Sequence, residues 1–98
     1  METFNDIIQS NKPTLVDFYA TWCGPCKAMT PIIQQLGKEL QSTARVLKID
    51  VDKNPATAAR FQIRSVPTLM IFKNGNIVWQ QPGGMDKNSL KNIILKYV

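Results

Sequence analysis

The stretch that decides the fold reads LVDFYATWCGPCK and spans residues 15–27. Its first part, residues 15–20, is a nearly unbroken apolar run of the kind that parallel sheets bury on both faces. The turn that follows holds Cys23 and Cys26, and beyond it apolar side chains recur at helical spacing to about Leu40. This stretch therefore predicts a buried strand, a turn that carries two cysteines, and a helix.

The rest of the chain continues this alternation of helices and strands. Asn74-Gly75, between two apolar runs, is the strongest short signal of a β-hairpin. Two βα crossovers followed by a hairpin predict a mixed sheet that is parallel at first and has helices on both faces. Expected helices cover residues 3–10, the cysteine turn to about 40, 54–61 and 86–97, and expected strands cover 15–20, 44–51, 68–72 and 77–80.

Length and composition indicate one small globular domain. With 98 residues, 44% hydrophobic and 19% charged, the chain has room for a single core, so residues 1–98 are treated as one unit. No apolar stretch reaches the roughly 20 residues that span a bilayer. Glu2 and Asp6 lie near the start, where a signal peptide carries basic residues before an apolar run. We therefore expect a cytoplasmic protein that does not bind membranes.

The charge pattern does not indicate nucleic-acid binding, although the net charge is +5. The twelve lysines and arginines are spread from Lys12 to Lys96 without a run of three, which favours a solvated basic surface. The chain contains no histidine. Catalysis by a Cys–His or Ser–His pair and metal binding by histidine are therefore excluded.

The two cysteines allow three interpretations. A zinc site needs about four ligands, whereas the chain offers two thiols and no histidine, so no metal site is expected. A structural disulfide between Cys23 and Cys26 would close too short a loop to constrain the unfolded chain much. A redox pair is the interpretation that a C-x-x-C motif near a βαβ pattern favours. At the first turn of a helix, backbone N–H groups stabilise a thiolate on Cys23, while Cys26 lies one turn deeper. Gly24 and Pro25, between the cysteines, are expected to tune the redox properties of the pair.

The motif from Trp22 to Lys27 resembles the active site of the thioredoxin family, and other segments resemble that family in the same order. The resemblance extends from about Phe4 to Tyr97. It implies a thioredoxin-like α/β fold with a central mixed sheet. The matching segments are the strand at 16–20, the cysteine turn at 22–27, the cis-proline segment at 66–68, the hairpin turn at 72–75 and the glycine segment at 83–84.

The resemblance assigns a role to each matching residue. It makes Cys23 the attacking nucleophile and Cys26 the resolving cysteine. Asp17 matches a buried carboxylate that acts on the resolving thiol, and burial in an apolar strand should raise the pKa of such a group. Lys48 matches the lysine that pairs with this carboxylate, and Pro67 matches a cis-proline. The implied substrate surface consists of Trp22, Gly24, Pro25, Val66, Pro67, Gly83 and Gly84, with the backbone of Val66 free to pair with an extended substrate.

The function implied is general reduction of protein disulfides by a monomer. The resemblance implies no bound cofactor and electrons that come from NADPH through a separate flavin-dependent reductase. No G-x-G-x-x-G or phosphate-binding loop motif is present. Two alternatives stay open: a disulfide oxidase or isomerase of an exported compartment, and a binding module that uses the fold without redox turnover.

Three departures from the family pattern have structural consequences. The few residues before the first helix leave no room for the usual amino-terminal strand, so four strands and a more exposed sheet edge are expected. Tyr19 stands where many members have a second tryptophan. Pro82 precedes the glycine segment where an ordinary apolar residue is common, which leaves substrate contacts there open.

Overall fold

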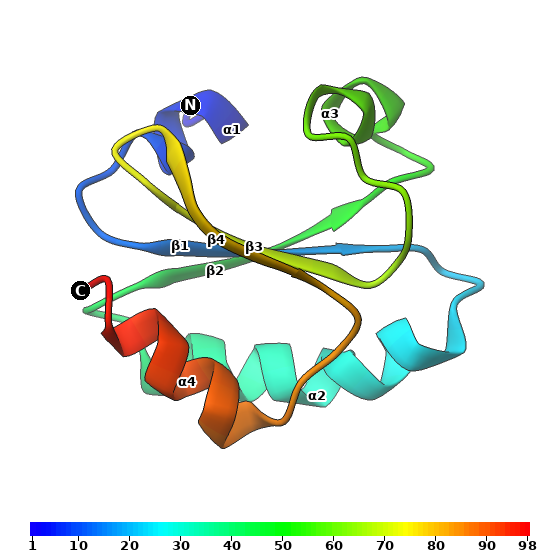
Figure 1. Cartoon of the computed structure of the whole chain (residues 1–98). Helices are drawn as coiled ribbons and strands as arrows, with labels where there is room; N and C mark the ends of the chain where they lie inside the picture. Colours follow the sequence, from blue (N-terminus) through cyan, green and yellow to red (C-terminus); the bar gives the residue numbers. More distant parts are fainter.

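The computed structural model describes all residues, 1–98. Four strands form one sheet in the order β2-β1-β3-β4. Helices α1 and α3 lie on one face of this sheet, and α2 and α4 lie on the other (Figure 1). The predicted four-stranded mixed sheet with helices on both faces is confirmed. The elements are α1 (Phe4–Ile8), β1 (Thr14–Tyr19), α2 (Gly24–Glu39), β2 (Arg45–Asp50), α3 (Pro55–Arg60), β3 (Thr68–Lys73), β4 (Asn76–Pro82) and α4 (Lys87–Leu95).

Strand directions differ from the prediction at one point. Strands β1 and β2 are parallel, but β3 is antiparallel to β1. The prediction of two parallel crossovers is therefore wrong for the second one. Helix α2 has 16 residues and spans about 24 Å, enough to return along a strand of about 20 Å. Helix α3 has only six residues and spans about 9 Å, so the chain enters β3 from the end at which it left β2.

The predicted hairpin joins β3 to β4. Asn74 and Gly75 both have positive φ, 53° and 82°, as a two-residue type I′ turn requires. The backbone N–H of Asn74 donates to the carbonyl of Ser10, and that of Gly75 donates to the carbonyl of Ile8, both at 2.9 Å. These two bonds fasten the hairpin to the end of α1.

No strand precedes α1, so β2 and β4 form the two edges of the sheet. Five of the six residues of β2 are only partly buried, as expected for an edge that no further strand covers. Arg45, the first residue of β2, makes a two-bond ion pair with Glu2 at 2.7 and 2.8 Å. A capping box between Thr3 and Asp6 starts α1 beside this pair.

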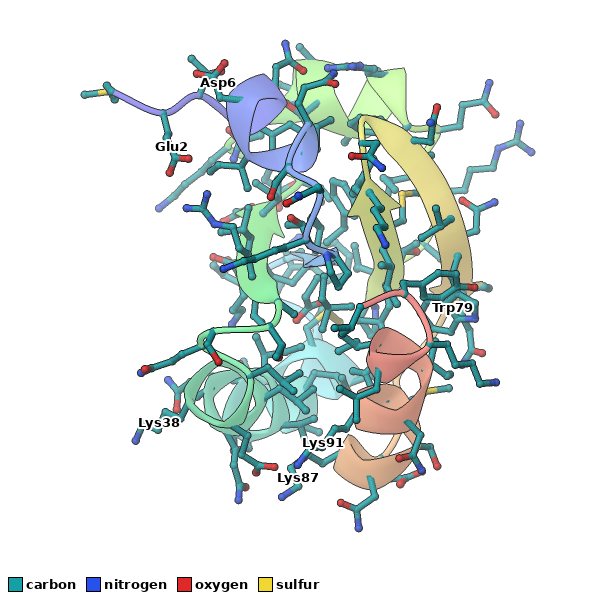
Figure 2. All side chains as sticks on the ribbon, turned by 90° about the vertical axis from the view of Figure 1, so that its left-hand side faces the viewer. Glu2, Asp6, Lys38, Trp79, Lys87 and Lys91 are labelled. Atoms are coloured by element: carbon teal, nitrogen blue, oxygen red, sulfur yellow. A yellow bond between two sulfur atoms is a disulfide. The ribbon has the colours of Figure 1, made fainter.

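Helices α2 and α4 are joined at the surface by one acidic and two basic side chains. Lys87 and Lys91, on neighbouring turns of α4, each donate to the carboxylate of Glu39 at 2.8 Å (Figure 2). These hydrogen bonds lower the pKa of Glu39 to about 2. This contact therefore stabilises the folded protein fully above the ordinary pKa of glutamate, and the stabilisation is lost as the pH falls toward 2.

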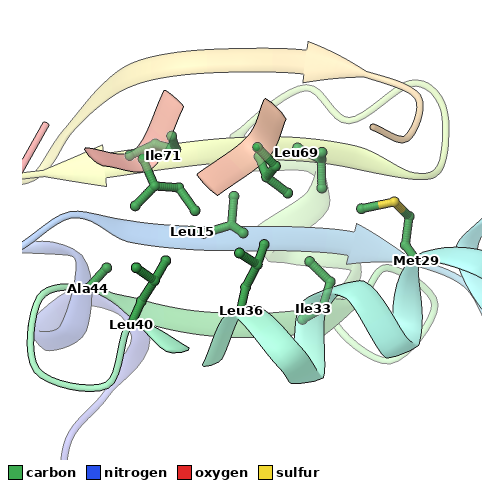
Figure 3. Packing of buried hydrophobic residues seen from close by; sticks show 10 residues of the cluster. Leu15, Met29, Ile33, Leu36, Leu40, Ala44, Leu69 and Ile71 are labelled. Atoms are coloured by element: carbon green, nitrogen blue, oxygen red, sulfur yellow. The ribbon is translucent and has the colours of Figure 1, made fainter. Parts of the chain in front are cut away.

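The core has two layers because side chains alternate along the strands. On β1, Leu15 and Asp17 point toward α2 and α4, while Val16 and Phe18 point toward α1 and α3. Figure 3 shows the first layer, where side chains of α2 pack against those of β1 and β3. Its buried members are Leu15, Met29, Ile33, Leu36, Leu40, Ala44, Leu69, Ile71, Leu90 and Ile94.

Truncation of the first core layer is expected to destabilise the fold strongly. Leu36 is fully buried, so Leu36→Ala should lower the free energy of unfolding by about 2–5 kcal/mol through lost burial and the cavity that remains. Denaturant unfolding measures this loss. Leu95, which is 44% exposed on α4, is the matched control, and Leu95→Ala should change stability by about 0.5 kcal/mol or less. Similar losses in the two variants would contradict this account of the core.

Candidate redox site

The two cysteines lie at the amino-terminal end of α2, directly beyond β1. They form a disulfide, with the Cα atoms 5.3 Å apart. Cys23 is the N-cap residue, and the backbone N–H of Cys26 donates to its Sγ at 3.1 Å. Cys23 and Cys26 are 4% and 2% exposed, so the pair is almost covered. Pro25 occupies the first turn of the helix, where a missing N–H leaves no intrahelical bond unmade.

This position gives the sulfur of Cys23 an environment that favours negative charge. The unpaired N–H groups of a first helical turn and the helix dipole both stabilise an anion there. The 3.1 Å bond from Cys26 shows one such donor already directed at Cys23 Sγ. The site can therefore support a reactive thiolate when the disulfide is reduced.

Trp22 directly precedes Cys23 in the chain, and its side chain lies at the surface. It is 70% exposed, and its indole Nε1–H donates to Oδ2 of Asp52 at 2.8 Å. The sequence predicts Trp22 as part of the substrate surface but does not identify Asp52. An exposed aspartate 30 positions away carries no local signal of such a contact. The hydrogen bond restrains the orientation of the exposed indole.

Removal of this hydrogen bond should loosen Trp22. A bond of this kind is worth about 1 kcal/mol, so Asp52→Ala is expected to speed solvent exchange of the Trp22 indole N–H by about fivefold. Exchange measured by NMR on the two indole signals separates Trp22 from Trp79. Asp52→Asn keeps an acceptor oxygen and should retain most of the protection. Equal exchange in the wild type and Asp52→Ala would show that the bond does not hold the indole.

The segment Val66-Pro67 lies against the disulfide. The Val66–Pro67 peptide bond is cis, as the family resemblance implied. Cys23 Sγ is 3.7 Å from the carbonyl oxygen of Val66. The N–H of Gly83 donates to the carbonyl of Pro67 at 2.7 Å, and Gly83 has φ +87°, which favours glycine. A Cβ at Gly84 would lie 3.0 Å from the sulfur of Met29.

The predicted substrate residues therefore gather around the cysteines. A small hollow of about 170 Å³ opens beside Trp22 and Val66. Pro67 is buried behind this surface, whereas Gly24, Pro25 and Gly84 are exposed. The hollow also includes residues that the sequence did not identify. These are Val51, Ile63, Arg64 and Ser65.

Asp17 is a fully buried carboxylate in the middle of β1. Both of its oxygens lack a hydrogen-bond partner in the protein. Burial raises the pKa of Asp17 to about 6, and the positive charge of Lys48 opposes this rise. The side chain lies on the face of β1 that packs against α2, the helix that carries Cys26. The structure thus holds a proton-binding group with a pKa near neutrality on the face of the sheet that α2 covers.

Lys48 lies beside Asp17 in the register of β1 and β2 but does not form an ion pair with it. Its ammonium donates to Thr30 Oγ1 at 2.9 Å and lies 4.3 Å from the ring centroid of Tyr19. Lys48 therefore acts on Asp17 through its charge and not through a hydrogen bond, because Thr30 and Tyr19 hold the ammonium. The Thr30 hydroxyl donates to the carbonyl of Cys26 at 3.4 Å. Thr30 is four residues after Cys26, so helical spacing is the signal that could have linked them.

Known proteins are similar to this chain in sequence and in structure. The family model described as Thioredoxin matches residues 1–96. The chain belongs to the thioredoxin family. It is 48% identical to the thioredoxin of Rickettsia conorii, over 95% of this chain and 89% of that protein. It is 46% identical to the thioredoxin of Staphylococcus saprophyticus, over 97% of this chain and 90% of that protein.

A solved thioredoxin structure supports the same assignment. A single-site mutant of the thioredoxin from Halobacterium salinarum superimposes with a TM-score of 0.86 at 42% identity, over 95% of this chain and 80% of that one. As a thioredoxin with its cysteine pair in place, this chain is a thiol–disulfide oxidoreductase that reduces protein disulfides. Thioredoxins generally act without a bound cofactor, on disulfide-containing proteins and with a reductase. None of the helices is long and apolar enough to cross a membrane.

Proposed function

We propose that residues 1–98 act as one monomeric domain, a general disulfide reductase of the cytoplasm, with Cys23 as the attacking nucleophile. The observation that carries this proposal is the position of Cys23 at the start of α2, with an N–H at 3.1 Å from its sulfur. In the reduced protein, the thiolate of Cys23 attacks one sulfur of a substrate disulfide. A bond forms between Cys23 and that sulfur, the substrate S–S bond breaks, and the other substrate sulfur leaves as a thiolate.

Cys26 completes the reaction as the resolving cysteine. Its thiol loses a proton and attacks Cys23, which releases the second substrate thiolate and forms the Cys23–Cys26 disulfide. Asp17 accepts the proton through a bridging water molecule, and its pKa of about 6 suits proton transfer near neutral pH. Lys48 acts as a positioning residue, since its charge sets how readily Asp17 ionises.

The substrate backbone is bound next to Val66. The carbonyl of Val66 lies 3.7 Å from Cys23 Sγ, so an extended segment that pairs with Val66 brings its own sulfur close to Cys23. The shortage of charged groups in this surface suits many different disulfide substrates. One side of the binding surface consists of Trp22, Gly24 and Pro25. The other consists of Pro67, Gly83 and Gly84, where small residues let the substrate backbone approach.

The oxidised protein is re-reduced by a separate enzyme in this proposal. Two electrons from NADPH pass through a flavin-dependent reductase to the Cys23–Cys26 disulfide. Gly24 and Pro25 favour the reducing direction, since Pro25 removes an N–H that would stabilise the thiolate further.

A reconstituted assay tests the proposal. NADPH, a flavin-dependent thioredoxin reductase and this protein are mixed with a disulfide-bonded protein substrate, and NADPH oxidation is followed by absorbance. The wild type should turn over many equivalents of substrate, and the variant with both cysteines replaced by Ser should give only the background rate. A wild type that gives only the background rate, like the double variant, would favour a binding module without redox turnover.

A further inference from the structure

A groove larger than the hollow at Trp22 lies on the same side of the molecule as α3. It has a volume of about 650 Å³ and runs between the segment 60–65 and the strands β3 and β4. It exists because the short helix α3 leaves β4 uncovered on this face, where Ile77 is 43% exposed. We call it the arginine groove. Its polar lining residues include Arg60, Gln62, Arg64, Ser65, Gln80 and Gln81.

The arginine groove carries positive charge that no carboxylate balances. Arg60 and Arg64 are both exposed, and no aspartate or glutamate lines the groove. The guanidinium of Arg60 donates to Asn5 Oδ1 at 2.6 Å and lies over the ring of Phe61, and both partners are uncharged. The ion pairs of the protein involve other basic residues. Arginine presents paired N–H donors that match a carboxylate, so the groove suits an acidic ligand.

The arginine groove is continuous with the surface around the disulfide. Ile63, Arg64 and Ser65 line both the groove and the hollow beside Trp22. Ser65 is followed by Val66, whose carbonyl lies 3.7 Å from Cys23 Sγ. A polypeptide that places a disulfide at Cys23 and leaves the site past Arg64 therefore enters the groove.

We propose that the arginine groove binds an acidic segment of the substrate polypeptide that flanks the target disulfide, with its carboxylates on Arg60 and Arg64. The inference rests on the proposed function and narrows its substrate class. The glutamine side chains of the groove add donors and acceptors for the main chain of that segment, without selecting its sequence. A polypeptide is the expected occupant, because the groove leads to the sulfur of Cys23.

Competing peptide substrates test this preference. Two disulfide-bonded peptides differ only in Glu or Gln at the positions that flank the cysteine. At low ionic strength, kcat/KM should be about tenfold higher for the Glu peptide, because opposite charges speed association and two ion pairs form. The preference should shrink at high salt, where the Debye length is about 3 Å at 1 M. Equal rates for the two peptides would overturn the inference and leave the disulfide reductase function standing.

Matched double variants distinguish the effect of the groove arginines on the peptide preference from the effect of the protein's net charge. Arg60→Gln with Arg64→Gln should reduce the preference for the Glu peptide to less than about twofold. Lys38→Gln with Lys96→Gln removes the same charge from exposed positions outside the groove and should keep the preference. Loss of the preference in both double variants would overturn the inference, since net charge alone would then explain it.

Failure to reduce either peptide would refute the proposed function. A binding measurement still tests whether the arginine groove takes an acidic peptide in that case. A cysteine-free Glu peptide is titrated into the oxidised protein while NMR follows the backbone amides of Arg64 and Ser65. Saturable shifts that the arginine double variant loses would support the groove. Stronger shifts with a single-stranded oligonucleotide of equal charge, or self-association through these residues, would overturn the assignment to an acidic polypeptide.

Discussion

The Cys26→Ser variant is expected to lose turnover and to accumulate with its substrate attached to Cys23. The first step needs only Cys23, so a bond to the substrate still forms. The second step needs a thiol at position 26, and a serine hydroxyl cannot release the substrate by disulfide exchange. We expect turnover to fall by about a thousandfold or more, because the two cysteines act as one unit. Mass spectrometry under non-reducing conditions detects the trapped adduct.

Two matched controls define this result. Cys23→Ser should lose turnover to the same extent but trap no substrate, since it lacks the attacking sulfur. Treatment with a reductant should break the bond between Cys23 and the substrate and release the substrate as its reduced dithiol, two hydrogens heavier than the disulfide form. Normal turnover by Cys26→Ser, or trapping by Cys23→Ser instead, would reverse or remove the proposed roles.

Asp17→Asn is expected to stabilise the protein by about 3 kcal/mol at pH 8. Asp17 is fully buried without hydrogen bonds to its oxygens, and its pKa is raised to about 6. The fold therefore tolerates the protonated carboxyl better than the carboxylate. The charged Asp17 side chain destabilises the wild type increasingly as the pH rises from the ordinary pKa of aspartate to the pKa of Asp17 in the folded protein. The gain in stability from Asp17→Asn should be complete at a pH well above 6 and should vanish below pH 4.

Denaturant unfolding at pH 4 and pH 8 measures this difference for the oxidised protein. The same variant should slow disulfide turnover at neutral pH by about a hundredfold, the usual loss when a group that transfers a proton is removed. Asp86→Asn, which removes an exposed carboxylate whose pKa is lowered by the hydrogen bond from the backbone of Ser89, should show no such gain in stability as the pH rises. A gain in Asp17→Asn that is as large at pH 4 as at pH 8 would contradict the assigned pKa.

Local sequence patterns predicted the helices, the strands and the reactive cysteine pair. They do not report contacts between segments that are far apart in the chain. The cysteine spacing, the Asn74-Gly75 turn and the apolar strand around Asp17 are local signals, and the structure has each feature where expected. The direction of β3 depends on how far a short α3 can carry the chain, which periodicity does not report. Thr30 was missed as the partner of Lys48 because that contact joins residues 18 positions apart.

The equilibrium reduction potential of the Cys23–Cys26 pair is the decisive measurement for the reducing function. The protein is titrated in a thiol–disulfide buffer, and the redox state is followed by Trp22 fluorescence, with Trp22→Phe to isolate that signal from Trp79. We predict a potential below the glutathione poise of the cytosol, where each 30 mV corresponds to about 1.4 kcal/mol of driving force for reduction. A potential well above that poise would mean that the protein donates disulfides, and the proposed direction, compartment and reductase partner would all be contradicted.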